Sequence, residues 1–83
     1  MGLRQTTKIS IVDQIVNQIK TQIDTGELKT GDKLPSQVEM EKIFCVSRPT
    51  LQKAISKLIV MGLVEAQQGK GYFIRQVDDI VIL

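Results

Sequence analysis

Residues 36–62 read SQVEMEKIFCVSRPTLQKAISKLIVMG, and this stretch decides the fold. Ser36 followed by Glu39 matches the S-x-x-E pattern of a capping box, in which each side chain bonds to the backbone of the other residue. The pattern predicts a short helix over residues 37–44. We expect this helix to end in a tight turn at Cys45 and Val46, and its expected buried side chains are Met40, Ile43 and Phe44.

A second helix is predicted directly after that turn, over residues 47–61. Ser47 is a suitable N-cap, and Pro49 is tolerated because the backbone N–H groups of a first helical turn lack helical partners. Gly62 ends the helix. Apolar residues recur at helical spacing between these points, namely Leu51, Ala54, Ile55, Leu58 and Ile59. Two helices joined by a turn of three or four residues form a helix-turn-helix.

The segment before residue 36 predicts one more helix and a loop. Ser10 and Asp13 resemble a capping box, and Gly26 supplies a left-handed stop, so a helix is expected over residues 10–25. Its apolar stripe, expected to face the core, consists of Ile11, Val12, Ile15, Val16, Ile19 and Ile23. Residues 26–35 are expected to form a loop, whose anchors are Leu28 and Leu34.

The sequence after Gly62 changes to the pattern of a β-hairpin. Residues 63–66 and 72–75 are the expected strands, and residues 67–71 contain the glycines of the turn. A hairpin that follows a helix-turn-helix forms a wing. The predicted fold is therefore mainly α with a small β-hairpin, a winged helix-turn-helix of three helices plus a wing. We expect this domain to span residues 10–76, with residues 1–9 as a disordered or cloning-derived N-terminus.

The composition excludes several classes of site. The 83 residues contain no histidine and one cysteine, Cys45, which rules out an intrachain disulfide, a His/Cys zinc cluster and catalysis by an imidazole base. We expect no catalytic, metal-binding or cofactor-binding residues, and we interpret Cys45 as a small buried thiol. A single thiol suits a reducing compartment, and no apolar run approaches the roughly 18 residues of a membrane span.

The net charge is only +2, but the charges are unevenly distributed. Residues 1–47 carry six basic and six acidic side chains, whereas residues 48–75 carry five basic side chains and one acidic side chain. Such a local excess of positive charge favours a polyanionic partner such as nucleic acid. A solvated protein face would give the same distribution, so charge alone does not decide between the two.

The first turn of the helix at 47–61 carries side chains that suit a DNA-reading helix. Arg48 can bind guanine O6 and N7 or a phosphate, and Gln52 can pair with adenine N6 and N7. The hydroxyls of Ser47 and Thr50 can bind phosphates, and Lys53 points outward one turn later. In the alternative interpretation, Ser47 is only a cap and Arg48 is only solvated. The DNA interpretation requires this turn to face solvent and Arg48 to be free of an internal carboxylate.

The turn of the hairpin holds a second set of candidates, Gln68, Gly69 and Lys70. Glycine lets the backbone approach a phosphate chain or adopt a positive φ. Lys70 adds a cation, and Gln68 can reach the edge of a minor groove. A plain hairpin turn also needs glycine, and the two interpretations are compatible.

Three blocks of the sequence resemble the DNA-binding domain of GntR-type transcription regulators. They are Ile15–Ile23 with Gly26–Ser36, then Val46–Leu51, then Gly62–Phe73. The resemblance implies a cytoplasmic bacterial repressor or activator that binds a palindromic double-stranded DNA operator as a homodimer, with no membrane partner. It also implies a separate C-terminal domain for dimerisation and for a small-molecule effector, so that residues 77–83 would begin a linker or C-terminal strand leading to it.

The resemblance also assigns roles to individual residues. Arg48 and Thr50 would contact bases or phosphates, and Gly69 would lie at the minor groove. Val38 stands where the family usually has a DNA-contacting arginine. Gln52 replaces a second arginine, which shifts the preference from guanine towards adenine. The full set of expected DNA-binding residues is Ser36, Ser47, Arg48, Thr50, Gln52, Lys53, Gln68, Gly69 and Lys70.

The leading hypothesis is a sequence-specific DNA-binding transcription regulator, expected to be a repressor. In this hypothesis the helix at 47–61 lies in the major groove and the wing at 67–71 lies in the minor groove. The alternative is a winged-helix module that binds another protein and has little affinity for DNA. The apolar Val38 and the apolar segment Ile80–Leu83 favour that alternative.

Overall fold

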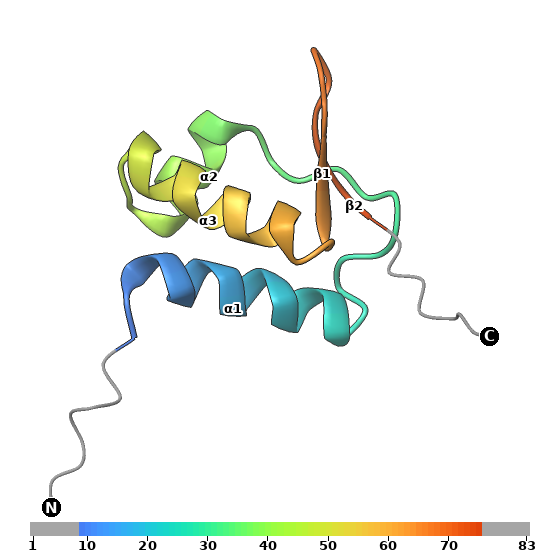
Figure 1. Ribbon diagram of the computed structural model, residues 1–83, viewed down its shortest axis with the longest axis horizontal. Coiled ribbons are helices and arrows are strands. Elements are labelled where there is room, and N and C mark those ends of the chain that lie inside the picture. Colours follow the sequence, from blue (N-terminus) through green and yellow to red (C-terminus); the bar gives the residue numbers. More distant parts are fainter. Residues whose placement is uncertain (1–8, 76–83) are drawn as a thin grey trace, which may run out of the picture.

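The computed structural model describes residues 9–75, which form three helices and a two-stranded hairpin (Figure 1). The elements follow in the order α1 (Ile11–Asp24), α2 (Gln37–Phe44), α3 (Arg48–Val60), β1 (Val64–Gln67) and β2 (Gly71–Ile74). The predicted winged helix-turn-helix is confirmed. The expectations for residues 1–8 and 76–83, including the apolar segment Ile80–Leu83, lie outside the described residues.

α1 begins where the sequence predicts it. The Ser10 hydroxyl accepts a hydrogen bond of 3.1 Å from the backbone N–H of Asp13. The buried residues of this helix are Ile15, Val16 and Ile19. The prediction that Ile11 shares their buried stripe is wrong, because Ile11 is exposed. Residues four apart on a helix are offset by about 40°, so a row of isoleucines at that spacing rotates off the face that meets the core.

α2 has both hydrogen bonds of the predicted capping box. The Ser36 hydroxyl accepts from the Glu39 backbone N–H (3.1 Å), and the Glu39 carboxylate accepts from the Ser36 backbone N–H (2.9 Å). Met40 is buried and Phe44 packs against the core. The prediction that Ile43 is buried is wrong, since its exposed fraction is 58%. Ile43 and Phe44 lie about 100° apart on the helix, and the core meets the side of Phe44.

The turn between α2 and α3 differs from the prediction at Cys45. This residue is the C-cap of α2 and has a left-handed backbone with a φ of 56°. A left-handed residue reverses the direction of the chain after a helix. Here it leaves the Cys45 side chain exposed while Val46 packs against the core. The prediction of a buried thiol is therefore wrong.

α3 contributes more buried residues to the core than any other described element. Four of its five predicted apolar residues are buried, and Ile59 is exposed; the buried four are Leu51, Ala54, Ile55 and Leu58. α3 packs against α1, α2 and β1. α1 lies along α3 on the side away from the tip of the hairpin (Figure 1). Ser47 has the extended backbone of an N-cap, but its side chain makes no capping bond, so the predicted cap is only partly correct.

The two strands pair antiparallel, with Val64 opposite Ile74 at the base of the hairpin. Each strand is shifted by one residue towards the turn from its predicted position. A hydrogen bond of 2.9 Å from the Lys70 N–H to the Gln67 carbonyl oxygen closes the turn. Gly69 has a φ of 77°, which the third residue of a type II turn requires. The turn therefore needs glycine for a conformational reason that is independent of any ligand.

The segment predicted as a plain loop adds a third extended stretch beside β2. The Leu34 N–H donates to the Tyr72 carbonyl oxygen, and the Ile74 N–H donates to the Asp32 carbonyl oxygen, both at 2.8 Å. These bonds connect the hairpin to the residues just before α2. The wing and the helix-turn-helix are therefore held in one fixed arrangement.

An ion pair joins α1 to α3 at the surface. Lys57 Nζ lies 2.8 Å from Asp13 Oδ1. The hydrogen bond from Lys57, and then its charge, hold the pKa of the Asp13 carboxyl below its ordinary value. Because folding lowers this pKa, the pair stabilises the folded state fully above the pKa of the unfolded carboxyl, about 3.9. Its contribution is lost as the pH falls through the lower pKa of the folded state.

Leu58→Ala should destabilise the domain by about 2–5 kcal/mol, because truncating a fully buried leucine leaves a cavity. The matched control is Val60→Ala on the same helix, where the side chain is 86% exposed. We expect the control to change the free energy of unfolding by no more than about 0.5 kcal/mol. Urea unfolding followed by circular dichroism measures both, and equal losses would contradict the orientation of α3.

Asp13→Asn should lower the unfolding free energy at neutral pH, because it removes the charge that pairs with Lys57. The difference from the wild type should shrink below about pH 4 and vanish below the folded-state pKa of Asp13. Urea unfolding midpoints measured between about pH 7 and pH 2 test this expectation. A difference that stays constant over that range would show that the ion pair does not stabilise the fold.

Candidate nucleic-acid interface

The exposed side of α3 is set by its buried side. Arg48, Gln52 and Lys53 are all exposed. At about 100° per residue, Arg48 and Gln52 lie about 40° apart around the helix, whereas Lys53 lies about 140° from Arg48. Arg48 and Gln52 therefore form one strip along α3, which we call the Arg48–Gln52 strip. Lys53 belongs to a different part of the exposed surface.

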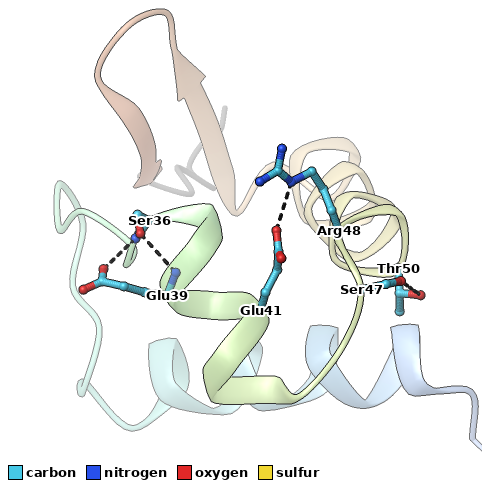
Figure 2. Close-up of polar contacts among 6 residues, drawn as sticks. All are labelled: Ser36, Glu39, Glu41, Ser47, Arg48 and Thr50. Carbon is cyan, nitrogen blue, oxygen red and sulfur yellow. Dashed lines mark hydrogen bonds and ion pairs between the residues drawn. The ribbon is translucent and has the colours of Figure 1, made fainter.

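Arg48 is paired with a carboxylate of the preceding helix. Its Nε donates to Glu41 Oε2 at 3.0 Å, and Figure 2 shows Glu41 reaching from α2 towards the guanidinium. The Arg48 and Glu41 side chains are 56% and 25% exposed, so the pair lies at the surface and not inside the molecule. The requirement that Arg48 be free of an internal carboxylate is met only in part, because Arg48 is paired with Glu41 of the same chain although the pair lies at the surface. The first turn of α3 faces solvent. Arg48 is paired rather than simply solvated, and its contact with DNA stays a prediction.

The bond to Glu41 uses one edge of the guanidinium. An arginine side chain carries five N–H donors, four of which are on the two terminal nitrogens. Within residues 9–75, the hydrogen bond of the Arg48 side chain is made by Nε, which leaves the terminal nitrogens for an outside acceptor. An exposed ion pair contributes about 0–1 kcal/mol to stability. The pair is therefore a weak element of the fold.

Ser47 and Thr50 lie together at the N-terminal end of α3, on the side away from Arg48 (Figure 2). The Ser47 hydroxyl donates to Thr50 Oγ1 at 3.2 Å. This bond uses the hydroxyl proton of Ser47 and leaves that of Thr50 for an outside acceptor. The structure thus brings these two hydroxyls together and separates them from Arg48.

Ser36 is exposed at the N-terminus of α2. Its hydroxyl accepts the capping bond from the Glu39 N–H, which leaves the hydroxyl proton free to donate. The N-terminus of a helix also carries partial positive charge. Capping and contact with an anion are therefore compatible at this residue.

The wing presents a group of exposed residues at its tip, which projects from the helices (Figure 1). They are Gln68, Gly69 and Lys70. Lys33 adds one further positive charge beside the wing, and no pattern in the sequence predicts this position. Lys33 bridges to β2, and its side chain crosses Gly71, where an added Cβ would lie 3.1 Å from Lys33 Cε. Only the unexpected pairing of the segment before α2 with β2 brings Lys33 there.

Ion pairs reduce the positive patch that the sequence predicts. Of the five basic residues in segment 48–75, Arg48 faces Glu41 and Lys57 faces Asp13. Both carboxylates come from the electrically balanced segment 1–47. Counting charges by segment therefore overstates the positive charge around α3. Among residues 9–75, the cations of α3 and the wing region outside ion pairs are Lys33, Lys53, Lys70 and Arg75.

The described part of the chain has neither the residues of a metal site nor a helix that could span a membrane. No group of three or more His, Cys, Asp or Glu side chains there is placed to hold a metal ion. No helix in residues 9–75 has the length and apolar character needed to cross a membrane.

Sequence comparison relates the chain to known regulators. The family model described as "Bacterial regulatory proteins, gntR family" matches residues 11–74. The chain is 39% identical over 74 residues to the HTH-type transcriptional repressor NagR of Bacillus subtilis, covering 89% of this chain and 30% of NagR. It is 38% identical over 69 residues to the HTH-type transcriptional regulator Mce2R of Mycobacterium tuberculosis, covering 83% of this chain and 29% of Mce2R. The chain thus spans less than a third of the length of these relatives.

Two solved structures share the fold. AraR(DBD), solved in complex with operator ORX1, matches with a TM-score of 0.81 and 31% identity, covering 89% of each chain. YtrA from Sulfolobus acidocaldarius, described as a GntR-family transcription factor, matches with a TM-score of 0.80 and 37% identity. That match covers 86% of this chain and 74% of YtrA.

Proposed function

The chain belongs to the GntR family of bacterial regulatory proteins, and we propose on this basis that it is the sequence-specific DNA-binding part of a transcription regulator. In this proposal residues 10–76 form the DNA-binding domain. α3 enters the major groove of a double-stranded operator, and the tip of the wing contacts the adjacent minor groove.

The observation that carries the proposal is the orientation of α3. One face of this helix is buried in the core, and the rest of its surface presents the Arg48–Gln52 strip to solvent. The major groove of B-DNA is about 12 Å wide and admits an α-helix. AraR(DBD), which shares the fold, was solved in complex with an operator. That relative supports docking of the same surface here.

We assign base contacts to the Arg48–Gln52 strip and phosphate contacts to the hydroxyl groups. Arg48 can offer its terminal nitrogens to guanine O6 and N7, and the Gln52 amide can pair with adenine N6 and N7. Thr50, Ser47 and Ser36 are placed at helix N-termini, where hydroxyl and backbone N–H groups bind phosphates.

Cations and the wing complete the proposed contacts. Lys53 lies on a different side of α3 from Arg48. In this proposal it binds a backbone phosphate at one edge of the major groove. Gln68 and Gly69 suit the floor and edge of the minor groove, where an uncharged polar residue reads A·T against G·C. Lys70 and Lys33 supply positive charge for the flanking phosphates.

Two residues depart from the pattern that the resemblance to the family implies. Val38, in the first turn of α2, is 51% exposed and has no charge to offer a phosphate. Gln52 likewise replaces a cation with an amide. Fewer phosphate contacts give a smaller salt dependence, and an amide in place of a guanidinium favours adenine over guanine at that position.

The natural protein, in this proposal, is larger than the DNA-binding domain. The matched region makes up 30% of NagR, which leaves room in such relatives for a second domain. We assign to that domain homodimerisation and the binding of a small-molecule effector. Two copies of α3 would then read a palindromic operator, because half-site symmetry mirrors dimer symmetry. The name of NagR supports repression, and a regulator of this class acts in the cytoplasm.

A second candidate function is a module that binds another protein. The exposed apolar side chains of Val38 and Ile43 on α2 favour it. Titration of the chain with labelled random-sequence duplex DNA at low salt separates the two functions, because non-specific DNA binding is mainly electrostatic. Complete absence of binding under these conditions would support a protein partner and oppose DNA binding.

Arg48→Ala should weaken binding to a selected operator by about 1–3 kcal/mol, because it removes a bidentate base contact. The matched control is Lys20→Ala, which removes a positive charge from an exposed position of α1. Fluorescence anisotropy titrations at one fixed salt concentration compare the two with the wild type. If Arg48→Ala binds as tightly as the wild type, Arg48 is not part of the interface.

Lys70→Ala should weaken binding to selected and scrambled duplexes by the same factor, because a phosphate contact carries no sequence information. The slope of the logarithm of affinity against the logarithm of salt concentration should fall in magnitude by about 0.9. Titrations over a series of salt concentrations measure both effects. An unchanged slope would remove Lys70 from the phosphate contacts of the wing.

A further inference from the structure

Glu41 is an acidic residue of α2 that lies against α3. It takes no part in the capping box, which uses Glu39. Its side chain is only 25% exposed and lies against the first turn of α3, where its Oε2 accepts from Arg48 Nε at 3.0 Å. A carboxylate thus lies directly beside the arginine that the proposed function assigns to base contact.

The geometry of the pair restricts how Arg48 can meet a ligand. With Nε bonded to Glu41, a bidentate partner is left with the edge formed by the two terminal nitrogens. Figure 2 shows Nε facing Glu41, with one terminal nitrogen on the far side of the guanidinium and the other level with Nε. A restrained arginine loses less conformational entropy when it binds than a freely rotating one. Glu41 therefore prepares one edge of Arg48 for a bidentate acceptor.

The charge of Glu41 favours one acceptor over another. A guanidinium binds both phosphates and the O6/N7 edge of guanine. A phosphate that approaches Arg48 also approaches the Glu41 carboxylate and is repelled by it. Guanine carries no net charge, and its O6 and N7 atoms have only partial negative charge, so its penalty is smaller. A neighbouring carboxylate thus selects against the backbone and in favour of the base, which is specificity achieved by a repulsive element.

We infer that Glu41 is a positioning residue that directs the terminal nitrogens of Arg48 to a guanine edge and disfavours their binding to phosphate. The inference rests on the proposed DNA-binding function and adds a residue that determines base preference. It also accounts for a carboxylate close to a surface proposed to bind a polyanion.

The test measures base preference and not affinity alone. Duplexes bound by the wild-type chain are selected from a randomised pool, and the selection is repeated with Arg48→Ala. The position whose guanine preference disappears is the one that Arg48 reads. Affinities of each variant are then measured for the selected duplex, for the same duplex with that guanine pair replaced, and for a scrambled duplex.

Two variants of Glu41 separate its hydrogen bond from its charge. Glu41→Ala loses both, and we expect its guanine preference at the Arg48 position to fall roughly three- to tenfold. Its affinity for the scrambled duplex should rise roughly two- to fivefold, because the repulsion is gone. Glu41→Gln keeps an oxygen that accepts from Arg48 Nε. It should therefore retain more of the guanine preference than Glu41→Ala does, while its affinity for the scrambled duplex rises as in Glu41→Ala.

The control is Glu27→Ala, which removes the same charge from an exposed loop position after α1. Urea unfolding of each variant accompanies the binding data, because a purely structural effect would change stability and leave the base preference intact. If Arg48→Ala loses the guanine preference and Glu41→Ala keeps it, the inference is wrong and DNA binding stands. If the wild type selects no sequence, both the inference and the proposed function fail.

Discussion

The burial of one face of α3 is the constraint on which the rest of the structure depends. Leu51, Ala54, Ile55 and Leu58 are almost completely enclosed in the core that α3 shares with α1, α2 and β1. A helix that buries this face cannot rotate without exposing it, so the side chains on the remaining surface are fixed in direction. Arg48 and Gln52 face solvent for this reason. The bonds between β2 and the segment before α2 then fix the wing relative to the same helix.

Most of the fold could be predicted from the sequence because its signals are local. Capping at Ser10 and Ser36 depends on residues three apart, and the stop at Gly62 depends on one residue. The wrong predictions of burial occur where the outcome depends on which side of a helix packs against residues distant in the sequence. Ile11 and Ile43 fit the helical spacing of apolar residues, but both lie on sides of their helices that do not face the core, and both are exposed. The pairing of residues 31–34 with β2 has no alternating pattern to reveal it.

The candidate site could be predicted only as a set of residue types. The exposed first turn of α3 and the exposed tip of the wing match the sequence prediction, and the individual contacts with DNA stay predictions. The ion pairs could not be foreseen. Arg48 and Glu41 come together across the turn between two helices, and Lys57 and Asp13 are 44 positions apart in the sequence. Both pairs reduce the positive charge that a count along the sequence assigns to the region around α3.

The central claim is that the first turn of α3 lies in the major groove while the wing lies in the minor groove. Methylation interference on a selected duplex tests it directly, because methyl groups on guanine N7 occupy the major groove and those on adenine N3 occupy the minor groove. The account predicts that N7 methylation of the guanine read by Arg48 abolishes binding and that N3 methylation beside it weakens binding. Binding that tolerates N7 methylation at every guanine of the site would contradict the account.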